Sequence, residues 1–145
     1  MRVFFDTSVL VAASVAAHPH HARALPLLSR ALQGQDQGFV GMHSLAETFS
    51  ALTRVPVSPR IHPSDANRII RSNILAYCTL VAAEEADYLG AIDAVERLGL
   101  GGGKVYDALL LACAAKSSVE RIYTFNLADF KALASEEILG RVCAP

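Results

Sequence analysis

Cysteine is scarce in this sequence. Cys78, Cys113 and Cys143 are the only three, and no two of them form a Cys-x-x-Cys pair. Three thiols cannot all pair with one another within one chain, and the closely spaced pair that thiolate metal sites and redox motifs use is missing. We therefore expect reduced thiols that serve as small core residues.

Long apolar runs are missing as well. The stretch LLLACAA at 109–115 is far shorter than the roughly 20 residues that cross a bilayer. Asp6 interrupts the first apolar run, and the residues around it do not match a secretory signal peptide. We expect no transmembrane helix, no signal peptide and a cytoplasmic protein.

An excess of positive charge is the third absence. The formal net charge is −1, so the chain lacks the global basic field of many nucleic-acid-binding proteins. Any contact with nucleic acid must then use a local patch or a bound cation. Arginines on helix surfaces are usually just solvated, but those of the central third are where contacts with a phosphate backbone are expected. The candidates are Arg54, Arg68 and Arg71, with Arg60 nearby.

What the sequence does have is a large apolar fraction. Of its 145 residues 52% are hydrophobic and 19% are charged, which is typical of a globular chain. That length suits a single domain with a real core. We expect one domain over residues 1–145.

Short apolar strand patterns alternate with helical patterns along the chain. This alternation predicts an α/β fold, with a central parallel sheet of four to five strands and helices on both faces. Strands are expected at 2–5, 39–41, 76–82 and 121–125; helices are expected at 20–33, 44–55, 64–75, 85–98, from 104 onward and at 127–135.

Two of these helices show an apolar stripe at helical spacing. In helix 85–98 it consists of Leu89, Ile92, Val95 and Leu98; in helix 20–33 it consists of Leu25, Leu28 and Leu32. Each stripe is expected on one helix face.

Four acidic residues fall at or near the ends of strands or the starts of helices, where sites in open α/β sheets collect. They are Asp6, Glu47, Asp107 and Asp129. Each also has a purely structural explanation. Asp6 can cap the helix after its strand, and Asp107 in a first helical turn complements the helix dipole. Glu47 and Asp129 follow a serine and an asparagine by three residues, the spacing of a capping box.

If these four carboxylates lie close together in the fold, the structural explanations are no longer sufficient. Two like charges 4 Å apart repel by about 4 kcal/mol at an effective dielectric near 20. A cluster must therefore hold protons at raised pKa or bind cations. An oxygen-only ligand set suits a hard ion, Mg²⁺ or Mn²⁺. Since such ions keep waters and engage phosphates, the expected chemistry is hydrolysis of a phosphodiester.

The same residues carry a family resemblance. The segments VFFDTSVLVA (3–12), SLAETFSAL (44–52), GGGKVYDALLLACA (101–114) and YTFNLADF (123–130) resemble PIN-domain proteins, and most of all the VapC-type ribonuclease toxins of toxin–antitoxin pairs. The resemblance runs from Arg2 to about Ala134. It includes all four acidic positions, in order.

The resemblance implies a role for each residue. Asp6 and Asp107 would be direct metal ligands, and Glu47 and Asp129 would complete the site, partly through bound waters. Supporting positions match Ser8, Thr124 and Asn126. Family activity implies a Mg²⁺- or Mn²⁺-dependent endoribonuclease that leaves 5′-phosphate and 3′-hydroxyl ends. The implied partners are an RNA substrate, a second copy in a homodimer, and a cognate VapB-like antitoxin whose tail blocks the acidic site.

Two further motifs suggest binding sites at first sight. The segment GLGGGK (99–104) fails as a phosphate-binding loop, because only three residues separate its outer glycines and valine follows the lysine. Lys104 is either a solvated lysine or a contact to RNA phosphate. The segment HPHH (18–21) has no acid or cysteine at ligand spacing, which favours a solvated loop.

Two other functions remain open. An aspartyl-phosphate phosphohydrolase also places its acid after a first strand. Its chemistry requires an Asp-x-Asp motif, and Ser8 occupies the second aspartate position here, which argues against this function. A non-catalytic PIN-like module that binds RNA or protein is the stronger alternative, although the complete acidic set argues against it.

Overall fold

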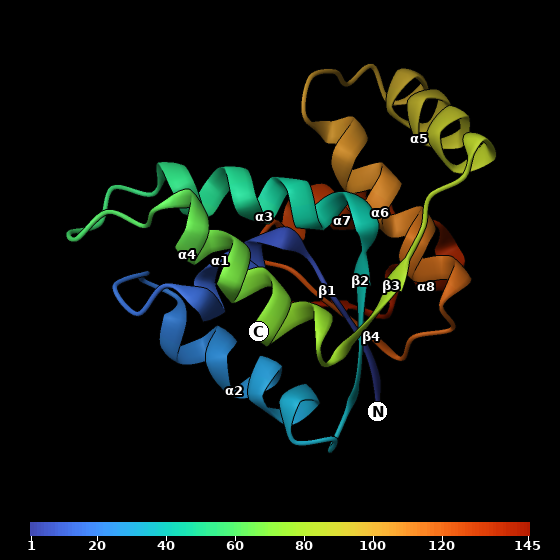
Figure 1. The fold of residues 1–145 in the computed structure, drawn as a ribbon. Coiled ribbons are helices and arrows are strands. Elements are labelled where there is room, and N and C mark those ends of the chain that lie inside the picture. The colour runs from blue at the N-terminus through green and yellow to red at the C-terminus, as the bar shows by residue number, and fades with distance from the viewer.

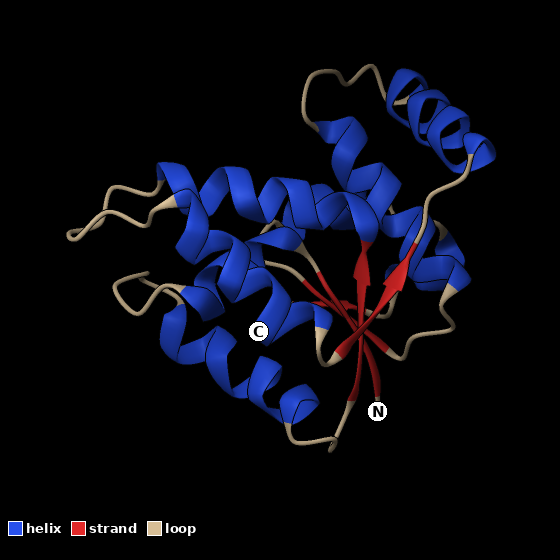
Figure 2. Ribbon diagram, viewed as in Figure 1, coloured by secondary structure: helices blue, strands red, loops and turns tan.

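The computed structural model describes residues 1–145 as a parallel sheet covered by helices (Figure 2). The strand order is β3-β2-β1-β4-β5, and every neighbouring pair is parallel. The α/β fold with four to five strands is thus confirmed. The strands are β1 (Arg2–Phe5), β2 (Gln37–Gly41), β3 (Cys78–Val81), β4 (Arg121–Tyr123) and β5 (Val142–Cys143).

Helices fill the connections between the strands, as Figure 1 shows. The expected helix 64–75 is divided into an α-helical and a π-helical part. The helices are α1 (Thr7–Ser14), α2 (His21–Leu32), α3 (Met42–Arg54), α4 (Pro63–Ile69), the π-helix η1 (Ile70–Leu75), α5 (Glu85–Arg97), α6 (Lys104–Lys116), α7 (Leu127–Leu133) and α8 (Glu136–Leu139). The short α8 and β5 are not predicted by the sequence patterns, because neither is long enough to show a period. None of these helices is long and apolar enough to span a bilayer.

Strand β1 supplies side chains to two separate cores. Val3 and Phe5 pack with α1, α2 and η1 on one face of the sheet, while Phe4 packs with α6, α7 and α8 on the other. Successive side chains of a strand point to opposite faces, and both faces of this sheet are covered by helices. The apolar run of β1 is therefore required at each position from Val3 to Phe5.

The apolar stripe expected on α5 is only partly a core face. Ala91 and Val95 are buried against Ala108 and Leu109 of α6. Leu89, Ile92 and Leu98 are 54%, 51% and 51% exposed, so Val95 is the buried member of the expected stripe. The reason is that α5 packs mainly on α6 and stands away from the sheet (Figure 1).

Helix α2 likewise buries only part of its apolar stripe. Ala24, Leu28 and Ala31 make its buried face, while Leu25 lies in solvent. The buried face is thus made largely of small alanines, which let the helix approach the sheet closely, and Leu25 lies at its edge.

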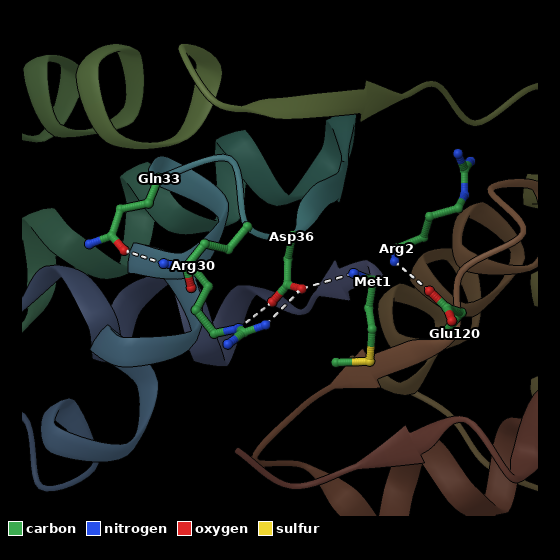
Figure 3. Close-up of polar contacts among 7 residues, drawn as sticks. Met1, Arg2, Arg30, Gln33, Asp36 and Glu120 are labelled. Carbon is green, nitrogen blue, oxygen red and sulfur yellow. Dashed lines mark hydrogen bonds and ion pairs between the residues drawn. The ribbon is translucent and has the colours of Figure 1, made fainter.

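An ionic cluster closes the amino-terminal edge of the sheet (Figure 3). Asp36 accepts hydrogen bonds from Arg30 Nε (2.6 Å), Arg30 Nη2 (3.1 Å) and the amino group of Met1 (2.9 Å). The Arg30 guanidinium, and then the Met1 amine, lower the pKa of Asp36 to about 2, against the opposing effect of burial. At this edge the charge of Asp36 is balanced by Arg30 and the amino group of Met1. The four candidate acids are not part of this cluster.

Close packing of β2 generates a first prediction. A methyl group on Gly38 would lie 2.8 Å from Cys78 Sγ, 3.2 Å from Ala31 Cβ and 3.3 Å from Phe5 Cε2. Gly38→Ala should lower the free energy of unfolding by about 1–3 kcal/mol, because overpacking strains the core. Gly90→Ala, in the interior of α5 with open space around it, should raise it by about 0.5–1 kcal/mol. Urea denaturation measures both, and a stable Gly38→Ala variant would contradict the packing.

Candidate active site

Asp6 directly follows β1 and is almost completely buried, with 2% of its surface exposed. Its backbone carbonyl begins α1, but its side chain does not cap the helix. The carboxylate Oδ2 instead accepts hydrogen bonds from Ser8 Oγ (2.5 Å) and Thr124 Oγ1 (2.8 Å). Burial raises the pKa of Asp6, and the two hydroxyl donors oppose that rise. The geometry therefore fixes this carboxyl group at the end of the strand.

The two hydroxyl groups tie β1 to the loop after β4. Ser8 Oγ accepts a hydrogen bond from the Phe125 amide (3.1 Å), and Thr124 Oγ1 accepts one from the Asn126 amide (2.9 Å). Each hydroxyl thus donates to Asp6 and accepts from the backbone. Ser8 and Thr124 therefore orient the Asp6 carboxylate. Asn126 takes part through its backbone, and its side chain makes no capping hydrogen bond.

Asp107 lies in the first turn of α6 and faces the same region. Burial first, and then the charges of Asp6 and Asp129, raise the pKa of Asp107 to about 7, while the ammonium group of Lys104 lowers it. Glu47 adds a smaller repulsion. Asp107 therefore interacts electrostatically with the other three carboxylates, although all four come from different elements of the chain.

Glu47 and Asp129 hold other partners at the rim of this group. Glu47 Oε1 accepts a hydrogen bond from Thr7 Oγ1 (3.2 Å) and lies 4.0 Å from His43 Nε2. Burial raises the pKa of Glu47, with His43 opposing the rise. Asp129 forms an ion pair with Lys104 Nζ.

The capping explanations for three of the acids do not hold. Helix α3 begins at Met42 with Gly41 as its cap, so Ser44 is inside the helix and cannot form a capping box with Glu47. Asn126 precedes α7 but makes no side-chain cap hydrogen bond, and Asp129 turns to Lys104 instead. Asp107, in the first turn of α6, and Asp129, in the first turn of α7, do lie where a negative charge is favourable relative to the helix dipole.

The donor set has the chemistry of a hard cation site. It contains four carboxylates and no thiolate, and Lys104 is the cation that meets Asp129. No three acidic, histidine or cysteine side chains lie close enough together to enclose a metal ion in this arrangement, in which Thr7 donates to Glu47 and Lys104 pairs with Asp129. The oxygen ligands suit Mg²⁺ or Mn²⁺, provided that these rim carboxylates turn inward.

A groove of about 400 Å³ runs from Glu47 along α3. One face of the helix lines it, with Arg54 at its far end, and Thr7 and Tyr106 lie across from that face. The ring of His43 stacks on Tyr106, with ring centroids 4.9 Å apart and planes 13° from parallel. Sequence reasoning missed both aromatic residues. The available signal was their spacing, because His43 is one helical turn before Glu47 and Tyr106 precedes Asp107.

The basic residues expected to contact RNA lie in different places in the structure. Arg54 lines the groove. Arg68 forms an ion pair with Asp65 (2.5 Å), and Arg71 donates to Asn67 Oδ1 (3.0 Å). Neither Arg68 nor Arg71 lines the groove. Lys104 lies at the acidic group itself, where it pairs with Asp129.

Known proteins resemble this chain in sequence and in fold. Residues 3–136 match the family model described as PIN domain. The chain is 33% identical to ribonuclease VapC27 of Mycobacterium tuberculosis over 79% of this chain and 78% of that one. It is 30% identical to ribonuclease VapC40 of the same species over 84% of each.

Solved structures add the fold. VapC20 of Mycobacterium tuberculosis, a toxin that cleaves the sarcin-ricin loop, superposes with a TM-score of 0.71 at 18% identity, over 92% of this chain and 97% of that one. A structure of VapBC2 from Rickettsia felis bound to a promoter DNA fragment superposes with a TM-score of 0.63 at 16% identity, over 100% and 99% of the two chains. The fold therefore matches over nearly the full length.

The raised pKa of Asp107 generates a prediction about stability in the absence of metal. When folding raises the pKa of an acid, the protonated group contributes to the stability of the folded state at pH values below its unfolded pKa, which is near 4. That contribution is lost as the pH rises through the folded pKa. The metal-free protein should therefore lose stability between pH 4 and about pH 7. Asp107→Asn should match wild type at pH 4 and be more stable at pH 8 by about 2 kcal/mol, allowing for partial exposure. Denaturation in EDTA at the two pH values measures this. Equal stability of the two proteins at pH 8 would contradict the repulsion.

Proposed function

Because the chain belongs to the PIN-domain family, and within it to the VapC type, we propose that it is a Mg²⁺- or Mn²⁺-dependent endoribonuclease. Its proposed centre is the set of four carboxylates of Asp6, Glu47, Asp107 and Asp129. The observation that carries this proposal is the half-buried position of Asp107 beside the other three acids. Burial first, and then their charges, raise the pKa of Asp107 to about 7.

Each side chain has a defined part in the proposal. Asp6 and Asp107 would hold the ion directly, because Asp6 is fixed by two hydroxyl donors and Asp107 is mounted on a rigid apolar helix. A bound Mg²⁺ or Mn²⁺ would supply an activated water and neutralise charge on the scissile phosphate. Glu47 and Asp129 would complete the ligand set, partly through waters.

Lys104 would change partner when the ion binds. Its ammonium group now neutralises Asp129, and a divalent cation would take over that role. The freed lysine would then lie at the edge of the site, where it could contact an RNA phosphate as a point charge. The low net charge of the chain is compatible with such local contacts.

The alternative is a non-catalytic PIN-like module that binds RNA or protein. It would be favoured by the observation that no three ligand side chains are close enough to hold a metal in this arrangement. The two functions differ in one measurable property, which is metal-dependent cleavage.

Cleavage of a mixed RNA pool tests the proposal. Wild type should cleave it with Mg²⁺ or Mn²⁺ and not in EDTA. Asp107→Asn should lose more than about 100-fold of the rate, because a direct ligand contributes several kcal/mol to binding the ion and the charged phosphate. Asp93→Asn, an exposed acid on α5, is the matched control and should cleave as wild type does. Equal rates for wild type and Asp107→Asn would overturn the assignment of Asp107, and no cleavage by wild type with either ion would favour the binding module.

The proposed partners are a VapB-like antitoxin that blocks the acidic site and a second copy of the chain. Similarity to ribonuclease VapC27 and to a chain of the VapBC2 structure supports the antitoxin. The exposed side chains of α5 and the loop after it support the homodimer, because monomeric proteins rarely expose contiguous apolar patches. These side chains are Tyr88, Leu89, Ile92, Leu98 and Leu100.

Light scattering after size-exclusion chromatography tests the homodimer. Wild type should elute as a dimer, and Leu89→Glu/Ile92→Glu should elute as a monomer, because buried unpaired charges are costly at an apolar interface. Leu139→Glu, on the exposed side of α8, is the control and should stay dimeric. A monomeric wild type, or a dimer that tolerates both charges, would rule out α5 as the interface.

A further inference from the structure

The groove beside the carboxylates has two chemically different ends. Glu47 and Tyr106 lie at one end, and Arg54 lies at the other. Glu47 and Arg54 are seven residues apart on α3, which is about 10 Å along the helix axis. Any strand whose phosphate met the carboxylates would therefore meet Arg54 through a different nucleotide.

Tyr106 is the unusual residue of this groove. It is 45% exposed and lies next to Asp107, and adjacent residues of a helix point in different directions. Its ring turns to α3, where it stacks on His43. His43 is itself held near Glu47 Oε1. The phenol ring is thus fixed on one side by an imidazole, and almost half of its surface remains in solvent beside the acidic site.

We propose that Tyr106, fixed by His43, is the stacking platform for an unpaired nucleobase next to the scissile phosphate. The inference rests on the proposed ribonuclease function and adds a binding site to it. Proteins hold single-stranded RNA bases by stacking them on exposed aromatic side chains, and Tyr106 is such a side chain. A base inside a duplex has both faces covered by its neighbours, so this platform selects an unpaired nucleotide.

Arg54 supplies the complementary charge. Its Nε donates to the Ser50 carbonyl (3.2 Å), which holds the side chain along the helix, and it forms no ion pair with an acid. The guanidinium is therefore available to the phosphate of a nucleotide farther along the strand. One acidic centre, one base platform and one phosphate contact together define the path of a short single strand along α3.

Binding without metal separates this site from the chemistry. The probe is a fluorescein-labelled, mixed-sequence single-stranded RNA of about eight nucleotides, within the usual range of single-strand sites, in EDTA at low salt. Fluorescence anisotropy should show about tenfold weaker binding for Tyr106→Ala, and binding within about twofold of wild type for Tyr106→Phe. Tyr77→Ala removes a tyrosine of similar exposure (50%) near the amino-terminal edge of the sheet and should bind as wild type does.

A tryptophan reporter adds a direct readout of stacking. The chain contains no tryptophan, so Tyr106→Trp carries a single one, and Tyr77→Trp is its matched control. The single-stranded RNA should quench the fluorescence of Tyr106→Trp and leave that of Tyr77→Trp unchanged. An abasic ribose–phosphate strand of equal length should quench neither.

Each outcome decides one of the two proposals. Equal RNA binding by wild type and Tyr106→Ala, no binding by either, or quenching by the abasic strand would overturn the base platform. If wild type still cleaves RNA in that case, the ribonuclease proposal stands without it. If binding depends on Tyr106 but wild type cleaves nothing with either ion, the platform stands and the catalytic function fails.

Discussion

Parallel pairing of β1 with β2 and β4 is the constraint on which the site depends. Phe5 is in register with Tyr123, and the Asp6 amide donates to the Tyr123 carbonyl (3.0 Å). Parallel strands end at the same edge of a sheet, so the residues that follow β1, β2 and β4 are brought together there. Asp6, the start of α3 and the Thr124 loop therefore share one region, although more than 100 residues separate the first from the last.

The chain reduces the electrostatic cost of that convergence in three ways. Ser8 and Thr124 donate hydroxyl hydrogen bonds to Asp6, Lys104 pairs with Asp129, and Asp107 has a pKa raised to about 7. Each of these features lowers the net negative charge or stabilises it locally. The remaining repulsion is what a divalent cation would relieve. The same feature that makes the metal-free site unfavourable thus supports the proposed function.

Sequence reasoning succeeded where a pattern has a local physical cause. The β1 run of apolar residues predicts a strand buried on both faces, and the four acids were identified from their places beside strands and helix starts. It did not show that Leu89 and Ile92 of α5 are exposed, because a helical stripe shows amphipathicity but not which neighbour covers it. The spacing around Glu47 and Asp129 also allowed capping boxes that the structure does not form, since the spacing of a box does not show where the helix begins. Spacing places His43 near Glu47 and Tyr106 next to Asp107, but it does not show that the two rings stack, because they are 63 residues apart in the chain.

The sequence by itself determined the order of strands and helices, the fold class and the identities of the candidate acids, because these follow from residue periodicity, composition and short motifs. Only the tertiary structure decided which charges meet. Interaction energies between charges depend on distances of a few ångströms and on burial, and neither quantity is written in the spacing of residues along a chain. The pairing of Lys104 with Asp129, the hydroxyl hydrogen bonds on Asp6 and the groove from Glu47 to Arg54 all result from packing elements that are distant in sequence.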